Sequence, residues 1–268
     1  STPSYSGNLT LEMNSTLQMG WTTSRPNSFN AIGGSVTMND GSQLRLRLPD
    51  PNPVVLPDIT MAGNGSIHLS PSTSAHHRAR EFNGIIDGVG TLTVIGNNNN
   101  TANLNVANPD WSGGFIADAD DSWRVDANAA GAFGTGDVTI NGDSSPTDRG
   151  ATLRINVDDV MDDFATLNLN GGFDHRLSSK LILNADDTIG AFFLDGLEIA
   201  GPNAGPGMFD QSSGLVDFLG RPLITGNGTL NVTGITQPAV PEPASVSIWS
   251  LMGIALAGFG VHRARKKK

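Results

Sequence analysis

Apolar and polar residues alternate along most of the chain, in short segments that recur from residue 43 to residue 232. In these segments Leu, Ile or Val takes every second position, and mostly polar residues such as Thr, Asn, Gln or Arg fill the positions between. This period of two predicts β-strands with one buried face rather than amphipathic helices. The predicted strands are residues 43–48, 65–69, 90–95, 137–140, 151–157, 165–169, 180–183 and 228–232.

Strands this short cannot bury a face alone, so they must stack on similar strands or pair across two sheets. Residues 64–69 and 227–232 are near-copies of each other, which favours a repeating stack. Gly and Asn flank nearly every strand, and we expect them to supply the positive φ of tight turns. The predicted fold is all-β: a right-handed parallel β-helix, or solenoid, of short rungs over residues 1–235. A β-sandwich is the alternative.

One stretch of the body carries a more specific pattern. Between Gly88 and Val157, a Gly-Thr-Leu-Thr-Val strand precedes Trp-Ser-Gly-Gly at 111–114 and an Asn-Ala-Ala-Gly-Ala-Phe-Gly corner at 128–134. This succession resembles the autotransporter-associated β-strand repeat, although Phe133 stands where a smaller aliphatic residue is usual. That family forms β-helical stalks in bacterial surface proteins. The resemblance therefore implies a structural role for the body.

The end of the chain breaks the alternation. Residues 244–261 contain no charge and are apolar on all sides, and their length fits a transmembrane helix, which needs about 17–25 residues. We therefore predict a linker with a Pro-Glu-Pro motif at 236–243, a transmembrane helix at 244–261 and a basic cytoplasmic tail at 262–268. The cations of this tail are Arg263, Arg265, Lys266, Lys267 and Lys268.

The motif Pro241-Glu242-Pro243, followed by the apolar span and the basic end, resembles a PEP-CTERM sorting signal. That family occurs in Gram-negative bacteria that make exopolysaccharide. Its signals are recognised by exosortase, a membrane-embedded cysteine-type transpeptidase. The resemblance implies that Pro241, Glu242 and Pro243 form the recognition motif, and that the span and tail are removed during processing. It also implies an inner-membrane-anchored precursor that moves to the cell envelope or the extracellular matrix of a biofilm, with exopolysaccharide as a further partner.

Composition narrows the function of the exported body. The formal charge is −10 although five of the 16 Lys and Arg residues lie in the tail, so nucleic-acid binding is not expected. The chain has no Cys, which excludes disulfides, thiolate metal ligands and a thiol nucleophile. It begins at Ser1 without a signal peptide, so we expect a mature form or a fragment.

Aspartates are the main candidates for chemistry. They cluster at 118–121, at 158–163 and at 186–187, and grouped carboxylates are the ligands that Ca²⁺ requires. None of the clusters has EF-hand or β-roll spacing, so we interpret them as solvated acidic turns and predict no cofactor. The candidate for a Ca²⁺ site among them is Asp118, Asp120 and Asp121.

The preferred function is that of a structural or adhesive surface protein without enzymatic activity. The alternative is an exported carbohydrate-binding protein, glycoside hydrolase or polysaccharide lyase, but the basic residues scatter along the sequence instead of accompanying the acids. The stretch from His76 and His77 to Arg80 is interpreted as a solvated basic loop, because adjacent histidines on a strand point to opposite faces. Trp21, Trp111 and Trp123 could stack on sugar rings, yet packing between rungs is the preferred interpretation of Trp111 and Trp123.

Overall fold

The computed structural model describes residues 7–20, 34–48, 54–71, 79–96, 100–119, 122–142, 150–171, 179–217 and 220–235. Every named element in these ranges is a β-strand. None of the described residues belongs to a helix long and apolar enough to cross a membrane. The transmembrane helix predicted at 244–261 falls outside these ranges, so the structure gives it no support.

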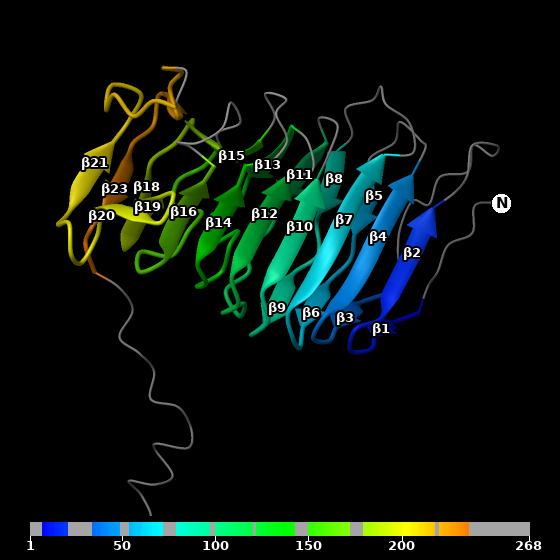
Figure 1. Ribbon diagram of the computed structural model, residues 1–268. Helices are drawn as coiled ribbons and strands as arrows, with labels where there is room; N and C mark the ends of the chain where they lie inside the picture. The colour runs from blue at the N-terminus through cyan, green and yellow to red at the C-terminus, as the bar shows by residue number, and fades with distance from the viewer. Residues whose placement is uncertain are drawn as a thin grey trace, which may run out of the picture. The chain divides into compact units, whose positions relative to one another are not determined.

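The body is a right-handed solenoid whose successive coils stack their strands in parallel (Figure 1). The predicted β-helix is therefore confirmed, and the β-sandwich alternative is wrong. In the coils of β3 to β11 the chain passes through a four-stranded, a nine-stranded and a seven-stranded sheet in turn, whereas the coils of β12 to β17 have strands in the last two sheets only. The four-stranded sheet contains β1 (Leu9–Leu11), β3 (Val36–Met38), β6 (Ile59–Met61) and β9 (Ile86–Gly88).

The other two sheets run along more coils. The nine-stranded sheet contains β2 (Thr16–Gly20), β4 (Ser42–Leu48), β7 (Gly65–Pro71), β10 (Leu92–Gly96), β12 (Phe115–Ala119), β14 (Val138–Asn141), β16 (Thr166–Asn170), β19 (Ala191–Leu194) and β20 (Leu197–Ala200). The seven-stranded sheet contains β5 (Val54–Leu56), β8 (Ala79–Phe82), β11 (Thr101–Leu104), β13 (Trp123–Ala127), β15 (Ala151–Ile155), β17 (Lys180–Leu183) and β22 (Ile224–Gly226).

The final coil ends the parallel stack differently. β20 returns antiparallel against β19, and β21 (Gly207–Phe209) lies antiparallel to β23 (Leu230–Val232). β23 also pairs in parallel with β18 (Asp187–Ile189) to form a three-stranded sheet. The antiparallel strands β20 and β21 thus pair with the edges of β19 and β23, to which a further coil could otherwise bind.

The core is built from columns of aliphatic side chains that point into the solenoid. In the nine-stranded sheet the in-register partners Ile67, Val94, Ala117 and Ile140 are all buried. The residues between them face outward and are half-buried. The alternation read from the sequence thus separates the interior of each rung from its surface, as the period of two requires.

Glycines at the corner before the nine-stranded sheet allow neighbouring coils to touch. A Cβ on Gly90 would strike the carbonyl oxygen of Gly63, one on Gly113 would strike that of Gly90, and one on Gly136 would strike that of Gly113. None of these glycines has a positive φ. Close backbone approach therefore explains them, and the expectation of positive φ is wrong at these three positions, although Gly88 (φ 97°) and Gly134 (φ 64°) at the same corner do have it.

Candidate functional site

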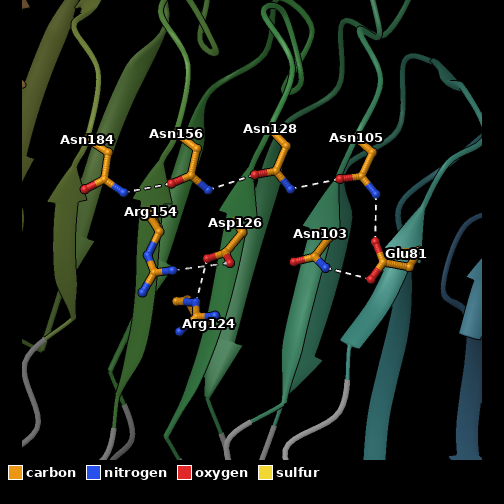
Figure 2. A network of polar contacts seen from close by, with 9 residues as sticks. All are labelled: Glu81, Asn103, Asn105, Arg124, Asp126, Asn128, Arg154, Asn156 and Asn184. Atoms are coloured by element: carbon orange, nitrogen blue, oxygen red, sulfur yellow. Dashed lines mark hydrogen bonds and ion pairs between the residues drawn. The ribbon is translucent and has the colours of Figure 1, made fainter. Parts of the chain in front are cut away.

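The outward face of the seven-stranded sheet and the corner that follows it carry a network of polar contacts between side chains (Figure 2). Two outward columns cross the central strands of this sheet, because side chains alternate between the two faces. One column contains Thr101, Arg124, Thr152 and Lys180 in register. The neighbouring column contains Glu81, Asn103, Asp126, Arg154 and Ile182.

Asp126 lies between two guanidinium groups at the centre of this face. Arg124 precedes it by two residues on β13, and its Nε lies 2.6 Å from Asp126 Oδ1. Arg154 is its direct partner on β15, with Nη1 3.7 Å from Oδ2. Asp126 is only 7% exposed, whereas the two arginine side chains are 36% and 30% exposed. One carboxylate therefore orients two cations that still reach solvent.

A ladder of asparagine amides runs along the corner that follows the seven-stranded sheet (Figure 2). We call Asn83, Asn105, Asn128, Asn156 and Asn184 the asparagine ladder. In each coil the Nδ2 group donates to the Oδ1 atom of the asparagine in the preceding coil, at 2.7–2.8 Å. All of the amide dipoles consequently point in the same direction along the stack.

Glu81 closes one end of the asparagine ladder. Its Oε2 accepts a hydrogen bond from Asn105 Nδ2 at 2.7 Å, and its Oε1 accepts one from Asn103 Nδ2 at 2.7 Å. A carboxylate thus meets the donor end of the aligned amides, where negative charge is favoured. The ladder and the ion cluster together fix the side chains of this face in defined positions.

The charge of this face differs from that of the rest of the chain. Arg124, Arg154 and Lys180, which we call the cationic patch, project from the neighbouring strands β13, β15 and β17. Among the described residues of this face, Asp126 and Glu81 together balance two of these three positive charges. The full chain has a formal charge of −10, so the patch is a local excess of positive charge on an acidic protein.

The structure describes one of the three residues of the calcium candidate. Asp118 faces outward from β12 and is half-buried, while Asp120 and Asp121 lie outside the described residues. In the ranges that the structure describes, no group of three or more His, Cys, Asp or Glu side chains is arranged to hold a metal ion.

Other aspartates of the predicted clusters hold turns. Asp158 Oδ1 accepts a hydrogen bond from the backbone N–H of Asp186 at 3.0 Å, and Asp186 Oδ1 accepts one from that of Thr229 at 2.8 Å. These contacts link one coil to the next at equivalent corners. They agree with the interpretation of the clusters as turns, and they show that these aspartates help to hold successive coils together.

Asp187 is the exception, because its carboxyl group is buried. The residue is 2% exposed, and desolvation raises its pKa to about 8, against an ordinary value of 3.8. Hydrogen bonds from the backbone N–H groups of Thr188 and Met161 lower the pKa, but less than burial raises it. The carboxyl group is therefore mostly protonated at neutral pH.

The structure also shows where two of the tryptophan candidates and Arg80 lie. Trp111 is fully buried and its Nε1 donates to Gly90 O at 3.0 Å, and Trp123 is 2% exposed, so both pack between rungs. The interpretation of the stretch up to Arg80 as a solvated loop is wrong at Arg80, which lies on β8 and points into the solenoid with no exposed surface. Trp21, His76 and His77 lie outside the described residues.

Sequence reasoning missed the cluster around Asp126. Arg124 and Asp126 stand two positions apart on β13, which was not among the predicted strands, and this spacing alone indicates a shared face. Arg154 joins them only through the register between β13 and β15, which the local pattern does not define. The basic residues that scatter along the sequence are therefore brought together by stacking.

The predicted sorting motif and basic tail lie beyond the described part of the chain, in a region where family comparison finds a match. Residues 239–266 match the PEP-CTERM protein-sorting motif. The PEP-CTERM signal implies an exported protein that is processed by exosortase, an inner-membrane enzyme, in an envelope of Gram-negative type. No curated protein and no solved structure matches the chain. The resemblance of the body to the autotransporter-associated repeat stays a prediction. The observed solenoid is compatible with it.

Proposed function

We propose that the solenoid of residues 1–235 is a structural and adhesive component of the cell envelope or extracellular matrix, delivered there by its PEP-CTERM signal. One observation supports this proposal: the same chain contains a sorting motif and a stack of coils. The coils are held together by backbone hydrogen bonds, by the buried core and by the asparagine ladder. A stack of this kind extends by repetition and holds its shape without disulfides.

The proposed role is not catalytic. Both carboxylate oxygens of Asp126 face guanidinium groups, so neither is presented to a substrate. Glu81 is likewise engaged by two asparagine amides. We expect no release of reducing sugars when the full chain is incubated with bacterial exopolysaccharide. Release that disappears in Asp126→Asn would contradict this part of the proposal.

The sorting step is tested by replacing Pro241, Glu242 and Pro243 with alanine in a bacterium that contains exosortase. We expect the variant to accumulate as an unprocessed precursor in the inner-membrane fraction, detected by immunoblotting of fractionated cells. Gln237→Ala with Pro238→Ala is the matched control, because both positions precede the matched motif. Normal size and location of the motif variant would refute processing at this signal.

The structural and adhesive role is tested by deleting the chain from its own strain. We expect cells to lose cohesion with the matrix, measured as the biomass retained on a surface under flow. Complementation with the full chain should restore retention, whereas complementation with the motif variant should not. Full retention in the deletion strain would contradict the proposed role even if sorting proceeds normally.

A further inference from the structure

We propose that the cationic patch binds an acidic polysaccharide whose chain runs across strands β13, β15 and β17. This inference deepens the proposed function by naming the class of polymer to which the solenoid adheres. The acidic protein repels an anionic polymer over most of its surface, so a local excess of positive charge defines where such a polymer can approach.

The spacing of the patch favours a polymer over a small anion. Arg124 and Lys180 occupy the same outward column on strands separated by β15, and Arg154 occupies the neighbouring column on β15 itself. Adjacent strands lie about 4.8 Å apart, which is close to the length of one extended sugar ring. A polyuronate crossing the strands would therefore bring successive carboxylates past successive cations.

Asp126 is a positioning residue in this arrangement. It holds Arg124 through Nε, so the terminal nitrogens of that guanidinium group stay available to a carboxylate from solvent. A guanidinium group recognises carboxylates through paired N–H donors, and fixing it in advance reduces the entropy lost on binding. Thr152, between Arg124 and Lys180 in the same column, offers a hydroxyl group to the sugar hydroxyls.

Nucleic acid is the competing anionic polymer, and the structure favours it less. Its binding requires the neutralisation of many phosphates along a basic surface. Here three cations stand beside Asp126 and Glu81 on the same face, on a chain of charge −10. A polymer with one carboxylate per sugar, or fewer, matches this modest charge better than a polyphosphate does.

The test measures binding of the full chain in detergent micelles to immobilised alginate, a polyuronate, at low ionic strength. Dextran, a neutral glucan, and single-stranded polydeoxythymidine are the comparison polymers. We expect binding to alginate that weakens as salt rises, with little binding to dextran. Lys180→Gln should lower the affinity for alginate about fivefold, and its combination with Arg124→Gln should reduce it to the level of dextran.

The matched control is Arg45→Gln, which removes one positive charge from an exposed position on the nine-stranded sheet. It should leave alginate binding within about twofold of the unmodified chain. Equal losses in Arg45→Gln and Lys180→Gln would show a dependence on net charge alone and overturn the proposal. Tighter binding of polydeoxythymidine than of alginate would also overturn it.

The outcomes separate this inference from the proposed function. Lys180→Gln leaves the sorting motif intact, so its processing and location should be normal. If the chain supports retention of cells but fails to bind alginate, the ligand inference is wrong and the structural role stands. If alginate binding depends on the patch while deletion leaves retention unchanged, the structural role fails instead.

Discussion

Two corners of the solenoid hold neighbouring coils together by opposite means. At the corner before the nine-stranded sheet, Gly90, Gly113 and Gly136 let the backbone of one coil rest on the backbone of the preceding coil. At the corner after the seven-stranded sheet, the asparagine ladder joins coils through side-chain hydrogen bonds at the surface. The first corner depends on the absence of a side chain, and the second depends on a particular side chain.

The difference determines how each corner should respond to substitution. A Cβ at a contact between backbones has no room, and neither backbone can move without disturbing its strand. A missing amide at the surface leaves hydrogen-bonding groups that water can reach, so the loss is smaller. Gly and Asn look alike as turn residues in the sequence, yet here they have distinct physical roles.

The largest effect is expected just past the asparagine corner, where Asp187 places a polar group inside the coil. Because its folded pKa of about 8 exceeds the ordinary 3.8, the contribution of Asp187 to stability should be greatest below about pH 4 and should decline as pH rises from about 4 to about 8. Asp187→Asn should remove this decline and raise the free energy of unfolding at pH 7 by up to about 4 kcal/mol. Urea unfolding of both proteins at pH 4 and pH 7 measures this change in the free energy of unfolding. An equal change at both pH values would contradict burial of the carboxyl group as its cause.

The next largest effect tests the glycine corner directly. Gly113→Ala should lower the free energy of unfolding by about 3 kcal/mol, because the new Cβ would strike the carbonyl group of Gly90. Gly114→Ala is the matched control, since its Cβ would first meet Asp137 O at 3.2 Å, and it should cost far less. Similar losses in both variants, measured by urea unfolding, would show that general turn propensity matters more than contact between coils.

The smallest effect tests the asparagine ladder. Asn128→Ala removes the hydrogen bonds to Asn105 and from Asn156, and should cost about 1–2 kcal/mol. Asn168→Ala is the control, because the contact of Asn168 Nδ2 with Thr139 Oγ1 on the neighbouring strand is long, at 3.5 Å. Thermal unfolding of both variants gives the comparison, and a loss at Asn128 as large as at Gly113 would remove the distinction between the corners.

The alternation of residues predicted much of the fold. Segments 43–48, 151–157 and 180–183 match β4, β15 and β17 to within two residues at each end, because a rung with one buried face must alternate. The register of the rungs was not predictable, since it depends on contacts between residues more than 20 positions apart in the sequence. The candidate site could therefore not be predicted from the sequence, because its residues come together only when β13 and β15 are aligned.

The near-copies within the chain favour a repeating stack, but they do not show where a segment lies within its coil. Residues 64–69 and 227–232 are near-copies, yet the first segment leads into β7 of the nine-stranded sheet and the second into β23 of the three-stranded sheet. The shared pattern satisfies a demand common to every corner, namely a polar turn followed by an alternating strand. This pattern therefore identifies a corner, but it does not show which corner of the coil it is. The distance between two copies consequently does not give the length of a coil.

The unequal spacing of the asparagine ladder has a practical consequence for this architecture. Neighbouring members are 22 or 23 residues apart at first and 28 apart later, although every contact between them has nearly the same length. The added residues fall between β14 and β15 and between β16 and β17, at the junction of the nine- and seven-stranded sheets. That junction is a natural insertion point, where a reporter or an affinity tag can be introduced while the columns on either side keep their alignment.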